Sequence, residues 1–107
     1  MPATADLLMR SRYTAYVLGK EPYLLQTWHA STRPQPPLID TSLKWLGLEV
    51  RKHVPDPQDP SRATVEFVAR YKDGGRAHRL HEISNFVREM DAQSLRWYYV
   101  DGTFPER

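Results

Sequence analysis

The hydrophobic pattern changes its period once along this chain, and that change constrains the fold more than any other feature of the sequence. Over residues 3–18, apolar and aromatic side chains recur at three- and four-residue spacing, which predicts an amphipathic helix. Over residues 46–51, apolar and polar side chains alternate, which predicts a half-buried strand. Helices followed by strands favour one α+β domain over residues 1–107, with the helices packed on one face of a curved antiparallel sheet.

Two helices are expected before the change of period. Gly19 stands where a helix often ends, and Pro22 suits the first turn of a second helix that reaches Trp28. The proline-rich passage 29–41 cannot form a regular strand or a long helix, because proline lacks a donor and restricts the residue before it. A short turn of helix can still form around residues 38–43.

Four strands are expected after it, over residues 46–51, 64–71, 76–88 and 95–100. The prolines in residues 55–60 make that segment a loop, and the polar residues 89–94 favour a turn. Between the second and third strands, Asp73-Gly74-Gly75 is a strong hairpin signal. The third strand is long enough to require a curved sheet.

The hairpin also predicts which side chains share a face of the sheet. A two-residue turn at Asp73-Gly74 or Gly74-Gly75 places odd positions of the second strand beside even positions of the third. The face toward the helices then holds Val65, Phe67, Ala69, Leu80, Phe86, Glu82 and Ser84. The opposite face holds Glu66, Val68, Arg70, Arg79, His81 and Ile83. A three-residue loop would reverse this assignment.

Composition excludes several classes of protein. The chain contains no cysteine, which removes disulfides, thiolate metal sites and cysteine nucleophiles. Fifteen Lys and Arg against 13 Asp and Glu leave a formal charge of +2, which does not favour nucleic acid as a partner. The first residues show no secretory signal and no apolar run reaches the length of a membrane span, so we expect a cytoplasmic protein.

The histidines do not indicate a metal site. His78 and His81 are three residues apart on a strand and therefore face opposite sides of the sheet. His29 and His53 have no partner at ligand-like spacing. No nucleophile elbow, phosphate loop or dinucleotide fingerprint occurs either. We therefore expect neither a metal nor a cofactor.

Glu82 is the position that most suggests chemistry. A carboxylate is expected on the helix-covered face beside Phe67 and Phe86, where it can serve as a general acid or base. The alternative, which we favour, is an ion pair with Arg10 or Arg12 that ties helix to sheet, because ion-pair networks also perturb buried carboxylates.

The aromatic residues have two interpretations. Most must be core in a domain of this size. Trp97-Tyr98-Tyr99, however, places aromatic rings on both faces of one strand. Together with Trp45, this suggests an outer sheet surface suited to self-association, and we expect a homodimer. Ordinary exposure of one tyrosine is the alternative.

Several segments resemble the YchJ-like family of bacterial proteins. They are Leu8-Met9-Arg10-Ser11-Arg12-Tyr13 with Ala15-Tyr16, Thr27-Trp28-His29 with Ser31-Thr32-Arg33-Pro34, residues 65–71, Leu80-His81-Glu82 with Ser84 and Phe86, and residues 96–102. The resemblance covers most of the chain in order. It implies an NTF2-like fold, in which helices and a bent sheet form a cone around a pocket. Many members carry flanking SEC-C segments that bind zinc through cysteines, and these 107 residues have no cysteine to supply them.

From the residues and the resemblance together, we expect a pocket that binds a small ligand or a protein segment. The expected lining is Arg12, Tyr13, Tyr16, Trp28, Glu82, Ser84 and Tyr99, with Arg12 as counter-ion of Glu82. NTF2-like relatives include enzymes as well as binding domains, so two alternatives stay open. One is a small lyase, isomerase or hydrolase that uses Glu82, His81 or Asp101 for proton transfer. The other is a non-catalytic module that dimerises through its outer sheet face.

Overall fold

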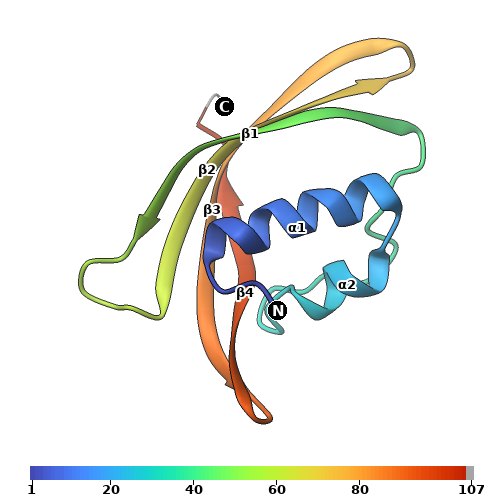
Figure 1. Cartoon of the computed structure of the whole chain (residues 1–107). Coiled ribbons are helices and arrows are strands. Elements are labelled where there is room, and N and C mark those ends of the chain that lie inside the picture. The colour runs from blue at the N-terminus through green and yellow to red at the C-terminus, as the bar shows by residue number, and fades with distance from the viewer. Residues whose placement is uncertain (106–107) are drawn as a thin grey trace.

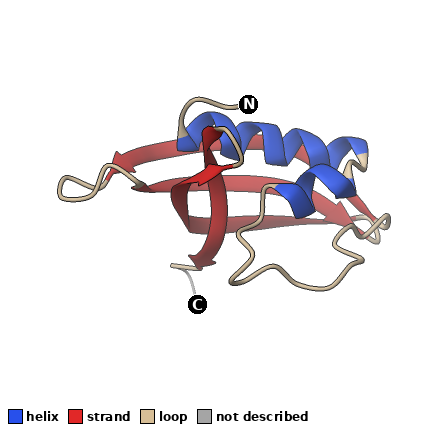
Figure 2. Ribbon diagram, turned by 90° about the horizontal axis from the view of Figure 1, so that it is seen from below, coloured by secondary structure: helices blue, strands red, loops and turns tan. Residues whose placement is uncertain are grey.

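The computed structural model describes residues 1–105 and confirms the predicted α+β order (Figure 1). The elements are α1 (Ala5–Leu18), α2 (Glu21–Gln26), β1 (Leu43–Pro55), β2 (Arg62–Asp73), β3 (Arg76–Asp91) and β4 (Ser94–Thr103). The four strands form one sheet in the order β1-β2-β3-β4, with every neighbouring pair antiparallel. Both helices lie on the concave side of this sheet (Figure 1, Figure 2).

Helix α1 lies against the sheet with a single face. Its buried residues recur at helical spacing, and they are Ala5, Leu8, Met9, Arg12 and Ala15. The helix ends at Gly19, whose φ of 71° is left-handed and carries little penalty for glycine. Neither helix within residues 1–105 is long and apolar enough to cross a membrane.

The register of β2 and β3 follows from a two-residue turn. Gly74 and Gly75 both have positive φ, and Asp73 pairs with Arg76. Counting along the strands from that pair places Phe67 opposite Glu82. The predicted division of side chains between the two faces is therefore correct.

The sheet bends because its register shifts at three places. Two shifts lie in β1, after Trp45 and after Val50, and one lies in β4, where Val100 is the extra residue opposite Asn85–Phe86 of β3. Each extra residue bends its strand and increases the local twist. The bent sheet wraps around α1, and the apolar core lies between them, built of Ala5, Leu8, Met9, Ala63, Val65, Phe67, Ala69, Phe86 and Trp97.

A contact that the sequence did not predict joins the end of α2 to the edge of the sheet. Trp28 forms a parallel bridge with Tyr99 of β4. The N–H of His29 donates to the Tyr99 carbonyl at 2.7 Å, and the Tyr99 N–H donates to the Thr27 carbonyl at 2.9 Å. This bridge covers the edge of β4 and fixes the start of the proline-rich passage.

The predicted turn of helix around residues 38–43 is wrong. Leu43 already begins β1, and residues 38–42 form no helix. The Glu21 carboxylate accepts the N–H groups of Leu38 and Ile39, so these donors are satisfied without a helix. The predicted strand 46–51 is longer than expected at both ends, and the turn predicted over residues 89–94 is shorter because β3 runs to Asp91.

Candidate functional site

A cavity of about 200 Å³ lies between α1 and the concave face of the sheet. Residues from both helical and strand segments line it: Met9, Arg12, Tyr13, Tyr16, Trp28, Trp45, Phe67, Ala69, Leu80, Glu82, Ser84 and Tyr99. All seven side chains that the sequence suggested for a pocket are in this set. The walls are mostly aromatic and aliphatic, and the charged groups among them are Arg12 and Glu82.

Glu82 brings a carboxylate into this apolar setting. The residue is 7% exposed, and its Oε2 accepts hydrogen bonds from Ser84 Oγ at 2.7 Å and from the Tyr99 hydroxyl at 2.9 Å. Within residues 1–105, Oε1 receives no hydrogen bond, and no fully buried side-chain oxygen lacks a partner. Oε1 is therefore not fully buried, and Glu82 is a residue that lines the cavity.

Tyr99 is coupled to that carboxylate. Burial raises the pKa of the Tyr99 phenol strongly, and the charge and hydrogen bond of Glu82 raise it further. The phenol thus stays protonated and remains a hydrogen-bond donor to Glu82 across the ordinary pH range.

Gly102 makes room for the carboxylate. A Cβ at this position would lie 2.1 Å from Glu82 Oε2 and 2.6 Å from its Cδ. Gly102 pairs with Ser84 in the register of β3 and β4, so both residues face the same carboxylate. Gly102 was not expected to have a role, although a glycine inside a strand often marks a close approach of another group to the backbone.

Arg12 holds the helices together. The residue is 3% exposed, and its Nη1 donates to the Leu24 carbonyl at 2.9 Å and to Thr27 Oγ1 at 2.6 Å. Its guanidinium lies over the ring of Tyr99 at 4.8 Å and over the ring of Trp28 at 5.1 Å. Burial lowers the pKa of Arg12, while nearby phenols and the charge of Glu82 oppose that shift.

The direct ion pair expected between Arg12 and Glu82 is not formed among the described contacts. Arg12 Nη1 donates to the Leu24 carbonyl of α2 and to Thr27, which follows this helix. Glu82 accepts its hydrogen bonds from Ser84 and Tyr99 of the sheet. The two charges still interact at longer range. Glu82 is therefore not saturated by arginine.

Trp45 corrects the prediction for the outer sheet face. Its ring contacts Tyr13 with ring centroids 5.8 Å apart and Tyr16 at 5.9 Å, so it faces the helices. Strict alternation places Trp45 and Leu48 on opposite faces of a strand. The bulge at Leu46 adds one residue and turns both toward the cavity side. Trp45 is therefore unavailable to an outer-face dimer.

Two of the three candidates for proton transfer lie away from the cavity lining. His81 Nε2 contacts Glu66 Oε2 at 2.7 Å on the opposite face of the sheet. Asp101 accepts a hydrogen bond from Asn85 Nδ2 at 2.8 Å. Of the three, only Glu82 lines the cavity.

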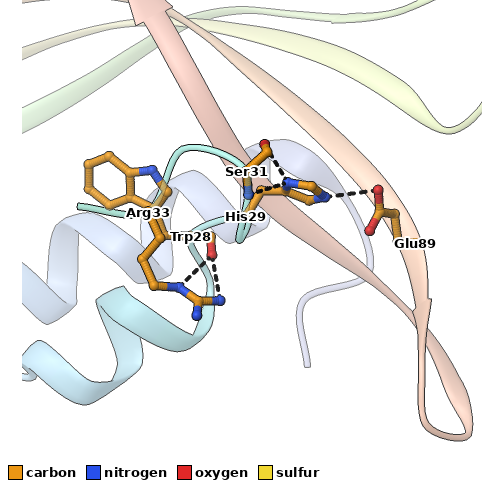
Figure 3. A network of polar contacts seen from close by, with 5 residues as sticks. All are labelled: Trp28, His29, Ser31, Arg33 and Glu89. Carbon is orange, nitrogen blue, oxygen red and sulfur yellow. Dashed lines mark hydrogen bonds and ion pairs between the residues drawn. The ribbon is translucent and has the colours of Figure 1, made fainter. Parts of the chain in front are cut away.

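A polar network holds the segment that carries Trp28 (Figure 3). His29 Nε2 contacts Glu89 Oε2 at 2.9 Å, while its Nδ1 contacts Ser31 Oγ at 2.7 Å and accepts the Ser31 N–H at 3.1 Å. Arg33 donates through Nε and Nη2 to the Trp28 carbonyl at 3.2 and 3.0 Å. The atoms have the order of a serine–histidine–acid set. However, the histidine–serine contact closes a local turn at the exposed surface, and Ser31 does not line the cavity. We interpret the network as a structural tie.

In the part of the chain that the structure describes, no group of three or more histidine, aspartate or glutamate side chains is arranged to hold a metal ion.

Two helices on the concave face of a bent antiparallel sheet, with a cavity between them, define an NTF2-like domain. The family model described as "YchJ, middle NTF2-like domain" matches residues 4–102. The chain belongs to this YchJ-like family, as its sequence segments predicted.

Similar proteins agree with this assignment. A UPF0225 protein of Cupriavidus metallidurans is 58% identical over 107 residues, covering 98% of this chain and 74% of the relative. A UPF0225 protein of Ralstonia nicotianae is 56% identical, covering 95% of this chain and 75% of the relative. The crystal structure of a SEC-C motif containing protein from Psychrobacter arcticus matches with a TM-score of 0.77 and 33% identity, covering 95% of this chain. This chain spans 61% of that solved protein.

Proposed function

We propose that this domain binds a small organic molecule in the cavity between α1 and the sheet. The observation that carries the proposal is the lining, in which apolar and aromatic walls surround one open carboxylate oxygen. Ligand sites commonly combine apolar walls with a few polar groups that fix orientation. Arg12, Tyr13, Tyr16, Trp28, Glu82, Ser84 and Tyr99 would all contact the ligand.

The size of the cavity favours a small molecule over a protein segment. An apolar cavity of about 150 Å³ takes benzene in another protein, so about 200 Å³ here suits one ring or two fused rings. A peptide strand or helix needs a longer groove. The walls are also held before any ligand arrives, because Arg12 and the Trp28–Tyr99 bridge fix their positions.

A fragment titration followed by two-dimensional ¹H–¹⁵N NMR tests this proposal. Saturable shifts are expected for cavity residues, including the indole N–H signals of Trp28 and Trp45. Trp97 is an internal reference, because its indole N–H donates to the Ala3 carbonyl at 3.2 Å and does not line the cavity. Ala69→Leu, which fills the cavity, should abolish the shifts. Aromatic fragments that never saturate the cavity signals would contradict the proposal.

Proton transfer by Glu82 is a second candidate function. The open Oε1 favours it, since a general base needs a free position near its substrate. Incorporation of solvent deuterium into bound compounds with an acidic C–H would support it. If compounds of this kind bind in the cavity and none takes up deuterium, proton transfer by Glu82 is ruled out.

A homodimer through the outer sheet face and a cytoplasmic location both stay predictions. Trp45 cannot contribute to this dimer interface, because its ring faces the helices. Light scattering tests it directly, since a dimer has twice the chain mass of 12.5 kDa. A monomer across the micromolar range would remove the dimer without affecting the cavity.

A further inference from the structure

One oxygen of the Glu82 carboxylate is left without a hydrogen bond in the cavity. Ser84 Oγ and the Tyr99 hydroxyl both donate to Glu82 Oε2, and Arg12 Nη1 donates to backbone and side-chain oxygens of the helical segment. Glu82 Oε1 receives no hydrogen bond from the described residues. An acceptor in apolar surroundings gains most from a ligand that brings a donor.

The charges of the cavity select against charged ligands. One cation, Arg12, and one anion, Glu82, share the lining. A cationic ligand would add a second positive charge near the buried guanidinium, and an anionic ligand would add a second negative charge near the carboxylate. Either excess charge is poorly solvated among aromatic walls. A neutral ligand leaves the existing balance intact.

The shape of the walls favours a flat ligand. The rings of Trp28 and Tyr99 are nearly perpendicular, with centroids 4.9 Å apart, and Tyr13 meets Trp45 at a similar edge-to-face angle of 78°. Perpendicular ring pairs of this kind present both a ring face and a ring edge to an aromatic ligand. The volume of about 200 Å³ again limits the ligand to one or two fused rings.

From these three observations we propose that the cavity takes neutral, planar compounds with an N–H donor, and that Glu82 Oε1 is the acceptor that selects them. This inference rests on the proposed function, because it names the ligand class of the same cavity. Arg12 contributes by opposing cationic ligands, and Ser84 and Tyr99 contribute by fixing Oε2 so that Oε1 faces the ligand.

A matched pair of ligands tests the inference. Indole and benzofuran have the same shape, but benzofuran carries an oxygen where indole has N–H. In NMR titrations of the wild-type chain, indole should bind about tenfold more tightly, as expected for one hydrogen bond to a charged acceptor. Benzylammonium and benzoate should both bind more weakly than indole. Equal affinity for indole and benzofuran overturns this inference and leaves the proposed function standing. Failure of both ligands to bind overturns the two together.

A matched pair of variants assigns the selectivity to Glu82. In Glu82→Gln, Ser84 and Tyr99 should hold the amide oxygen in the place of Oε2, so the amide NH₂ faces the cavity. The preference for indole over benzofuran should then vanish or reverse. Glu66→Gln, which changes a carboxylate on the opposite face, should keep it. NMR dispersion checks that each variant folds. An unchanged indole preference in folded Glu82→Gln overturns the assignment, and the wild-type ligand pair decides the inference if that variant does not fold.

Discussion

The carboxylate of Glu82 occupies the space that a side chain at Gly102 would fill. A Cβ built on Gly102 would come within 2.1 Å of Glu82 Oε2. The glycine lies on β4 and the glutamate on β3, so the contact depends on the pairing of these two strands. The position of Glu82, the proposed hydrogen-bond acceptor, therefore depends on Gly102, which has no side chain to contact a ligand.

Gly102→Ala should push the Glu82 carboxylate out of place. The methyl group would break the hydrogen bonds from Ser84 and Tyr99, and the free energy of unfolding should fall by about 1–3 kcal/mol. Urea denaturation measures the loss. Gly47→Ala is the matched control, because a Cβ there has no neighbour within 4 Å, and it should change stability by about 0.5 kcal/mol at most. Equal effects of the two substitutions would contradict this account of Gly102.

Arg12→Lys should destabilise the chain even though it keeps the positive charge. A lysine is a point charge and cannot reach Leu24 and Thr27 while covering two aromatic rings as the planar guanidinium does. We expect a loss of about 2–3 kcal/mol in the free energy of unfolding, mainly from the lost hydrogen bonds to Leu24 and Thr27. Arg10→Lys, on the exposed side of α1, is the control and should have little effect. If both variants unfold at the same urea concentration, Arg12 is not the tie that we describe.

The Tyr99 phenol should make stability sensitive to alkaline pH. Burial, reinforced by Glu82, raises its pKa in the folded state, whereas an unfolded tyrosine titrates near pH 10. The folded state therefore binds the proton more tightly, so this stability is complete below about pH 10 and is lost as pH rises further. Tyr99→Phe should be less stable than wild type at pH 7 by about 1 kcal/mol, and its stability should decline less steeply above pH 10. Parallel stability curves for the two proteins would rule out this role.

Asp6 should give a smaller effect in acid. The Thr4 hydroxyl donates to it at 2.6 Å and lowers its pKa, and the neighbouring His53 adds to that shift. A lowered pKa means that the stabilisation is present above the unfolded value near 4 and disappears as pH falls. Thr4→Ala should lower stability at pH 7 by less than about 1 kcal/mol, because the pair is partly exposed. The two unfolding curves should converge near pH 2, and a gap that persists there would contradict the explanation.

The sequence was sufficient for those features that depend on local chemistry. Two glycines define the β2–β3 turn, and this turn alone puts Glu82 on the helix-covered face beside Phe67. The family segments likewise contain all seven expected pocket residues, which lie around one cavity. Their role in binding stays a prediction.

Other features depend on contacts between distant residues and could not be predicted. Trp45 was assigned to the wrong face because the bulge at Leu46 interrupts the alternation. The neighbouring Gly47 is a signal of that bulge, but a strand glycine does not by itself say which residue is the extra one. Arg12 was expected to pair with Glu82, because opposite charges suggest a salt bridge. The structure instead satisfies it with a backbone carbonyl and a threonine, partners that a charge pattern does not reveal.

The most direct test of the account is a crystal structure of the chain grown with indole. We predict one indole in the cavity between α1 and the sheet, in contact with Trp28 and Tyr99, with its N–H within hydrogen-bond distance of Glu82 Oε1. A cavity that stays free of indole at saturating concentration, or an indole bound elsewhere on the domain, would contradict the central claim.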